Sequence, residues 1–152
     1  MATMLPTGGN HGYVQFVFPD GWTIFLTSAN GASDFPHQLV TRFDVTERQY
    51  YGSEYDIDLP RARRLLALAN ELEQCRRARK PVVLHCNHGR SRSVIALGAY
   101  LIYVCGANAI DALRALEAAF TAATVDRESH YHRLGNRVET ALFALENFRH
   151  RL

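Results

Sequence analysis

Residues 81–85 constrain the fold of this chain more than any other segment, because they form a short apolar run without alternation. A strand that is covered on both faces has this pattern, whereas a strand with one exposed face alternates polar and apolar side chains. An amphipathic helical pattern precedes the run at residues 60–79, and an apolar stretch follows it at 93–105. The sequence therefore predicts an α/β fold with a helix, a buried central strand and a second helix in a βαβ-type arrangement.

The remaining elements are predicted from the same periodicities. Aromatic and β-branched runs at residues 13–18 and 22–27 flank Pro19-Asp20-Gly21, which has the chemistry of a tight hairpin turn. Further strands are expected at 39–45 and 53–59, and further helices at 108–122 and 132–149. Together these elements predict a central mixed β-sheet flanked by helices.

Composition favours one compact domain over residues 1–152. The chain has 152 residues, 47% hydrophobic and 21% charged, and contains no internal repeat. Its three cysteines form no CxxC pair, and its first ten residues lack the basic and apolar regions of a signal peptide, so we expect a reducing, cytoplasmic setting. Glycines interrupt the apolar stretch at 94–110, which predicts a core helix and no membrane span.

The loop between the central strand and the following helix carries the chemistry. It reads His85-Cys86-Asn87-His88-Gly89-Arg90-Ser91-Arg92-Ser93. Backbone N–H groups of such a turn can converge on an anion, and the positive end of the next helix adds to their field. The same field favours the thiolate form of a cysteine, so Cys86 is predicted to be a nucleophile that attacks phosphorus.

Other residues of the loop have predicted supporting roles. Arg92 follows Cys86 by six positions and can aim its planar fork at two phosphoryl oxygens. Gly89 gives the backbone freedom to approach the anion closely, and Ser93 is expected to hydrogen-bond the sulfur and improve it as a leaving group. His85 is expected to orient the loop. The predicted phosphate-binding residues are Asn87, His88, Gly89, Arg90, Ser91 and Arg92.

The pattern His85-Cys86-x5-Arg92-Ser93 resembles the signature of cysteine-dependent protein tyrosine phosphatases, in particular the dual-specificity branch. Residues 22–32 look like the early strand and small-residue turn of that family. The resemblance implies a compact fold and hydrolysis of phosphotyrosine and phosphoserine/phosphothreonine in proteins through a cysteinyl-phosphate, without a cofactor. Two alternatives stay open: an RNA 5′-phosphatase, because His-Cys-x-His-Gly is similar to the loop of that branch, and a non-catalytic phosphate-binding module.

The resemblance also implies a general-acid aspartate on a loop upstream of the cysteine. Asp58 is the favoured residue, and Asp56 is the alternative. Because Pro60 suits the first turn of a helix, Asp58 can instead be only the N-cap of that helix. A zinc site formed by Cys86, His85, His88, His130 and His132 is disfavoured, because these residues lack the usual ligand spacing.

Overall fold

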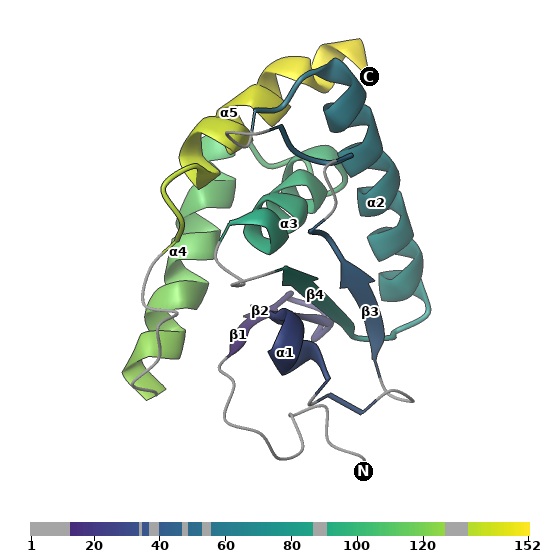
Figure 1. Ribbon diagram of the computed structural model, residues 1–152. Coiled ribbons are helices and arrows are strands. Elements are labelled where there is room, and N and C mark those ends of the chain that lie inside the picture. Colours follow the sequence, from purple (N-terminus) through teal and green to yellow (C-terminus); the bar gives the residue numbers. More distant parts are fainter. Residues whose placement is uncertain are drawn as a thin grey trace.

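The computed structural model describes residues 13–33, 35–36, 40–46, 49–52, 56–86, 91–126 and 134–152. Its elements follow one another along the chain as shown in Figure 1. They are β1 (Tyr13–Val17), β2 (Thr23–Ser28), α1 (Ala29–Ala32), β3 (Thr41–Asp44), α2 (Leu59–Arg77), β4 (Val82–Cys86), α3 (Arg92–Tyr103), α4 (Ala109–Asp126), α5 (Val138–Phe148) and a final 3-10 turn (Arg149–Arg151).

The four strands form one mixed sheet in the order β1-β2-β4-β3. β1 and β2 are an antiparallel hairpin, while β4 pairs in parallel with both β2 and β3. The predicted mixed sheet and central strand are therefore confirmed. The βαβ-type arrangement is also present, with β3 as its first strand and α2 as its helix.

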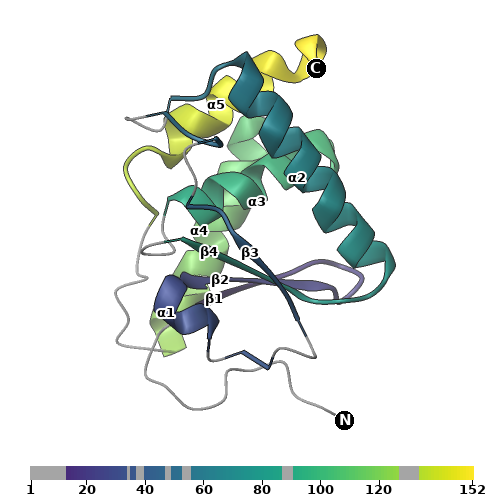
Figure 2. The same ribbon diagram turned by 45° about the vertical axis from the view of Figure 1, so that its right-hand side comes forward.

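Helices cover both faces of this sheet. α1 lies on one face, and α2 to α5 lie on the other, as the two views in Figures 1 and 2 show. Along β4, Val83 packs in the small cluster on the α1 side, whereas Val82 and Leu84 pack in the large core on the other side. This two-sided burial is the physical reason for the unalternated apolar run that marks β4 in the sequence.

α3 is the most deeply buried helix, with ten of its twelve residues buried. It packs against α2, α4, α5 and the sheet. Gly98 allows the close approach of α5, because a Cβ at this position would lie 2.2 Å from Cδ2 of Leu142. The apolar stretch is thus a core helix as predicted, and none of the helices in the described part of the chain is long and apolar enough to cross a membrane.

Most predicted elements differ from the structure by a few residues at their ends, and two differ in a way that has a physical reason. The predicted strand at 53–59 is wrong over its described residues: 56–58 belong to no strand, and Leu59 already begins α2. Its alternation arises because Ile57 reaches the core from a loop and Leu59 is the first helical residue. The last helix begins at Val138, not at 132, because the chain turns at residues 136–137 before the buried apolar positions begin.

Candidate active site

Cys86 is the last residue of β4, and only 3% of it is exposed. Its neighbour across the sheet is Ser28, the last residue of β2, so it lies at the carboxyl edge of the parallel strands. α3 begins six positions later, at Arg92. The predicted central strand before the loop and the predicted helix after it are therefore confirmed, while Asn87, His88, Gly89 and Arg90 lie outside the described residues.

The first turn of α3 lies directly against the sulfur of Cys86. Sγ of Cys86 is 3.6 Å from Oγ of Ser93, which is hydrogen-bond distance for sulfur, and Ser93 is completely buried. This is the contact expected from the sequence. Because Arg92 precedes Ser93 at the start of the same turn, the predicted nucleophile and the predicted clamp lie on adjoining segments.

The amino end of α3 provides a positive field beside that sulfur. Its N-cap is Ser91, and Ile95 N donates to Ser91 O at 2.8 Å as the helix begins. Among the described residues, the Ser91 side chain makes no capping hydrogen bond. First-turn N–H groups have no acceptor within the helix and carry the positive end of its dipole, so this position stabilises an anion.

Tyr51 is a residue of this region that sequence reasoning missed. Its hydroxyl donates to the backbone O of Arg92 at 2.6 Å, and only 2% of the residue is exposed. The contact joins the segment before α2 to the first turn of α3. Its partner is 41 positions away along the chain, and no periodicity in the sequence signals the contact.

The two candidate acids lie in the segment that follows Tyr51. Asp58 is the N-cap of α2: Oδ1 accepts from the backbone N of Arg61 at 3.1 Å, and Oδ2 accepts from Arg61 Nη1 at 2.8 Å. Asp56 is exposed, and its backbone O accepts from Gly52 N at 3.1 Å. The N-cap role of Asp58 is confirmed, and the role of Asp58 or Asp56 as general acid stays a prediction.

His85 lies between Thr27 of β2 and Asp44 of β3 in the sheet register. Burial lowers the pKa of its imidazole, the charge of nearby Asp44 raises it, and Arg42 lowers it further. Among the described residues, its buried Nδ1 has no hydrogen-bond partner. The imidazole is therefore neutral near pH 7, and the predicted role of His85 in orienting the loop stays a prediction.

The residues of the alternative zinc site are only partly described. His88, His130 and His132 lie outside the described residues. Within the described part of the chain, no group of three or more histidine, cysteine, aspartate or glutamate residues lies together in a way that holds a metal ion. Cys86 and His85 follow each other along β4, so their side chains point to opposite faces of the sheet.

Comparison with known proteins gives matches in structure alone. No protein-family model and no curated protein matches the sequence. Human DUSP28 matches over 93% of this chain and 97% of its own, with 21% identity and a TM-score of 0.61. A mouse putative dual specificity phosphatase, solved in complex with zinc tungstate, matches over 98% of this chain and 96% of its own, with 16% identity and a TM-score of 0.64.

A third structure, a leucine rich repeat and phosphatase domain containing protein from Entamoeba histolytica, matches over 92% of this chain and 94% of its own. Its identity is 12% and its TM-score is 0.67. These matches span nearly the whole length of each chain. The chain therefore has the fold of the dual-specificity phosphatases.

Proposed function

We propose that this chain is a cysteine-dependent phosphatase that removes phosphate from phosphotyrosine and phosphoserine/phosphothreonine side chains of proteins. The observation that carries the proposal is the contact of 3.6 Å between Cys86 Sγ and Ser93 Oγ at the amino end of α3. It lies within a fold that the chain shares with dual-specificity phosphatases. A buried cysteine beside a helix N-terminus and an adjoining arginine has the surroundings of a reactive thiolate.

In the first step, the thiolate of Cys86 attacks phosphorus. An S–P bond forms, and the P–O bond to the substrate oxygen breaks. The leaving oxygen takes a proton from an aspartic acid, for which Asp58 is our first choice and Asp56 the second. Arg92 and the first-turn N–H groups of α3 stabilise the charge on the phosphoryl oxygens.

In the second step, water attacks the phosphocysteine. The S–P bond breaks, inorganic phosphate leaves, and the aspartate takes the proton of the water. The Ser93 hydroxyl donates a hydrogen bond to the sulfur as its negative charge returns, which makes Cys86 a better leaving group. Because every step needs a reduced sulfur, we place the protein in the cytoplasm.

The mouse structure supports oxyanion binding in this fold, because that protein was solved with zinc tungstate. Tungstate is a tetrahedral dianion with the shape and charge of phosphate. Tungstate is therefore a suitable probe for this chain. We expect it to bind to the loop after β4 and to inhibit the hydrolysis of phosphate monoesters competitively.

The decisive experiment is to trap the covalent intermediate. The protein is mixed with 32P-labelled phosphotyrosine peptide, quenched within milliseconds and digested, and the label is located by mass spectrometry. We expect it on Cys86, with none in Cys86→Ser, while Cys86→Ser still binds tungstate. Turnover by Cys86→Ser at the normal rate would overturn the proposal.

A substrate panel then identifies the class of substrate. It contains phosphotyrosine peptides, phosphothreonine peptides and 5′-triphosphorylated RNA at equal concentration. We expect both peptide classes to be hydrolysed, with the higher kcat/KM on peptides that carry a second negative charge, because focused positive potential raises their association rate. A preference for RNA over every peptide would show that the chain is an RNA 5′-phosphatase, and binding without turnover would show a non-catalytic module.

A further inference from the structure

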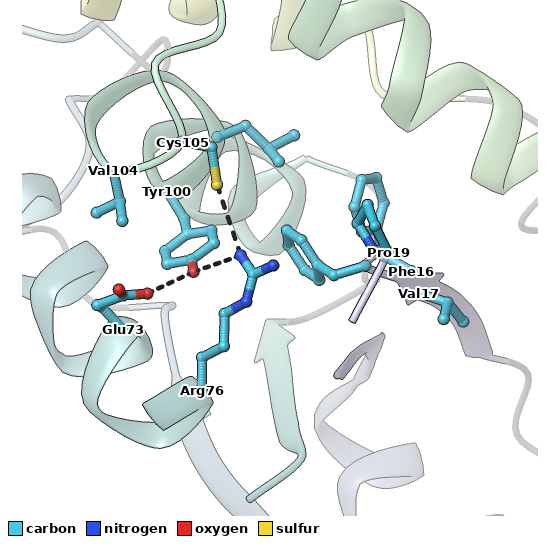
Figure 3. A pocket seen from close by; sticks show the side chains of 10 residues that line it. Phe16, Val17, Pro19, Glu73, Arg76, Tyr100, Val104 and Cys105 are labelled. Atoms are coloured by element: carbon cyan, nitrogen blue, oxygen red, sulfur yellow. Dashed lines mark hydrogen bonds between the residues drawn. The ribbon is translucent and has the colours of Figure 1, made fainter. Parts of the chain in front are cut away.

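A pocket lies at the opposite end of the sheet from Cys86. Its volume is about 510 Å³, within the range of small-molecule sites, which is roughly 300–1,000 Å³. It forms where the β1–β2 hairpin meets the carboxyl ends of α2 and α3 (Figure 3). Val17, at its edge, pairs with Thr23 at the start of β2, whereas Cys86 pairs with Ser28 at the end of β2.

One wall of this pocket is apolar and the other is polar. Phe16, Val17 and Pro19 from the hairpin, with Leu101 and Val104 from the end of α3, make the apolar wall. Glu73, Arg76, Tyr100 and Cys105 make the polar wall. In Figure 3 the Arg76 guanidinium reaches toward Tyr100 and Cys105, and Phe16 and Pro19 lie beyond it.

Arg76 is held rigidly but retains donor capacity. Its Nε donates to Asp20 Oδ2 at 2.9 Å, its Nη1 donates to the Tyr100 hydroxyl at 3.1 Å, and its guanidinium lies 4.5 Å from the centre of the Phe18 ring. Among the described residues, Nη2 has no hydrogen-bond partner. The side chain is 23% exposed, so its remaining N–H groups are partly removed from water and favour an acceptor.

Glu73 and Arg76 are the charged residues that line the pocket, and with the three further charged residues of their ion-pair network they leave an excess of one positive charge. Glu73 accepts from the Tyr100 hydroxyl at 2.8 Å and pairs with Arg77 at 3.5 Å. Asp20 pairs with both Arg76 and Arg79, at 2.9 and 3.1 Å. Two carboxylates thus face three guanidinium groups, which are Arg76, Arg77 and Arg79. A ligand with one negative charge would complete this balance.

We propose that this pocket binds a small organic monocarboxylate with an apolar body. The carboxylate accepts hydrogen bonds from Nη2 of Arg76, and the hydrocarbon part lies against Phe16, Val17 and Val104. This site is separate from the loop after β4 and does not depend on the proposed phosphatase activity.

Trp22 provides a direct measurement of binding. It is the single tryptophan of the chain, and its ring lies 5.0 Å from Phe18 and 5.7 Å from the Arg76 guanidinium. We expect 4-phenylbutyrate to change Trp22 fluorescence saturably, with one site and a Kd of about 1 mM or lower. The uncharged 4-phenyl-1-butanol should bind at least about tenfold more weakly. Equal binding of the two, or no saturable change, would overturn the proposal.

Matched variants at the edge of the pocket test its location. Val17 is 55% exposed, so substitutions there leave the core intact. Val17→Asp should weaken 4-phenylbutyrate about two- to fivefold by charge repulsion, whereas Val17→Lys should not weaken it. Arg76→Lys should weaken it by about tenfold or more, because an ammonium group cannot reproduce the planar fork. Identical affinities for the two Val17 variants would contradict the proposed site.

Competition with tungstate separates this site from the proposed active site. Saturating tungstate should leave the 4-phenylbutyrate titration unchanged, and displacement by tungstate would place the carboxylate at the loop after β4 and overturn the inference. The measurement needs no turnover, so it stands even if the chain hydrolyses no phosphate ester. Alkylation of Cys105, which lines the pocket, is a second test of where the ligand binds. We expect 4-phenylbutyrate to slow the reaction of Cys105 with N-ethylmaleimide. An unchanged rate would contradict binding in this pocket.

Discussion

Cys86 and Cys105 lie beside opposite ends of the same helix, and each has an arginine nearby. Cys86 adjoins the amino end of α3, which carries the positive end of the helix dipole. Cys105 follows the carboxyl end, where its backbone N donates to Tyr100 O at 3.1 Å and the helix dipole disfavours a thiolate. Partial desolvation of its sulfur, offset in part by Arg76 and Tyr100, raises the pKa of the Cys105 thiol, although the residue as a whole is exposed. The same pair of residue types thus provides a candidate nucleophile at one end and a weakly reactive thiol at the other.

The two arginines differ in the same way. Arg76 sits in a network of aromatic rings and carboxylates that joins the hairpin to α2 and α3. Arg92 is the first residue of α3, next to the residue that contacts the Cys86 sulfur. The end of the helix at which a cysteine and an arginine lie, more than their residue types, therefore separates the proposed chemistry from structural support.

The sharpest test of this contrast is to remove each sulfur in turn. Cys86→Ser should reduce kcat/KM on p-nitrophenyl phosphate by at least about four orders of magnitude, because the hydroxyl is a far weaker nucleophile. Cys105→Ser should change it by less than about twofold, within the range of an exposed substitution. Comparable losses in the two variants would contradict the separate roles of Cys86 and Cys105.

Exchange of each arginine for lysine is expected to have the next largest effect. Arg92→Lys should lower kcat by about 10²–10³-fold, because a point charge replaces a bidentate fork at the transferred phosphoryl group. Arg76→Lys should lower the midpoint of urea unfolding while kcat on the same aryl phosphate stays within about twofold of the original value. A larger kinetic effect at Arg76 than at Arg92 would reverse the assignment.

The packing of α3 against α5 at Gly98 can be tested by adding a single methyl group. Gly98→Ala should lower the free energy of unfolding by about 1–3 kcal/mol, because the new methyl group would overlap Leu142 in a closed core. Urea denaturation measures this change. The same substitution in a Leu142→Ala background should cost less, since the opposing side chain is gone. An equal cost in both backgrounds would show that the overlap with Leu142 is not the cause.

Asp58 has a structural role as the N-cap of α2 and a proposed chemical role as the general acid, and two substitutions separate these roles. Asp58→Ala should lower stability by about 0.5–2 kcal/mol through loss of the N-cap, whereas Asp58→Asn should retain most of it. If Asp58 is the general acid, Asp58→Asn slows phosphopeptides far more than activated aryl phosphates and flattens the basic limb of the pH profile. If Asp56→Asn produces this pattern instead, Asp58 is a cap and Asp56 is the acid.

The smallest expected effect concerns the ion pair between Asp20 and Arg76. A hydrogen bond from Arg76 lowers the pKa of Asp20 below its ordinary value of 3.8, although desolvation opposes the shift. A carboxyl group with a lowered pKa adds stability above pH 3.8, and this contribution is lost as the pH falls through the folded-state pKa. Thermal unfolding of Asp20→Asn should therefore differ from that of the unmodified protein at pH 6 and converge with it toward about pH 2. A difference that stays constant across this range would contradict the assignment.

Local patterns in the sequence were enough to predict the elements that position the loop. The unalternated run identified β4, the turn residues identified the hairpin, and the pairing of Asp58 with Pro60 identified the start of α2. The strand predicted at residues 53–59 is wrong, because a loop that places Ile57 in the core has the same alternation of polar and apolar residues as a strand. The Tyr51 contact and the pocket around Arg76 join segments that are far apart in the sequence, as in the pairing of Arg76 with Asp20 across 56 positions. Such contacts depend on tertiary packing and leave no periodic signal.

The burial of α3 also limits how the proposed active site can move. A helix covered by the sheet and by three other helices cannot open by itself, because opening would expose side chains such as Leu97 and Tyr100 to water. The amide hydrogens beyond its first turn are therefore expected to exchange with solvent only through unfolding of the whole core. Ser93 belongs to this helix, so its contact with Cys86 should last as long as the folded state itself. The chain thus holds its candidate nucleophile against its most deeply buried helix.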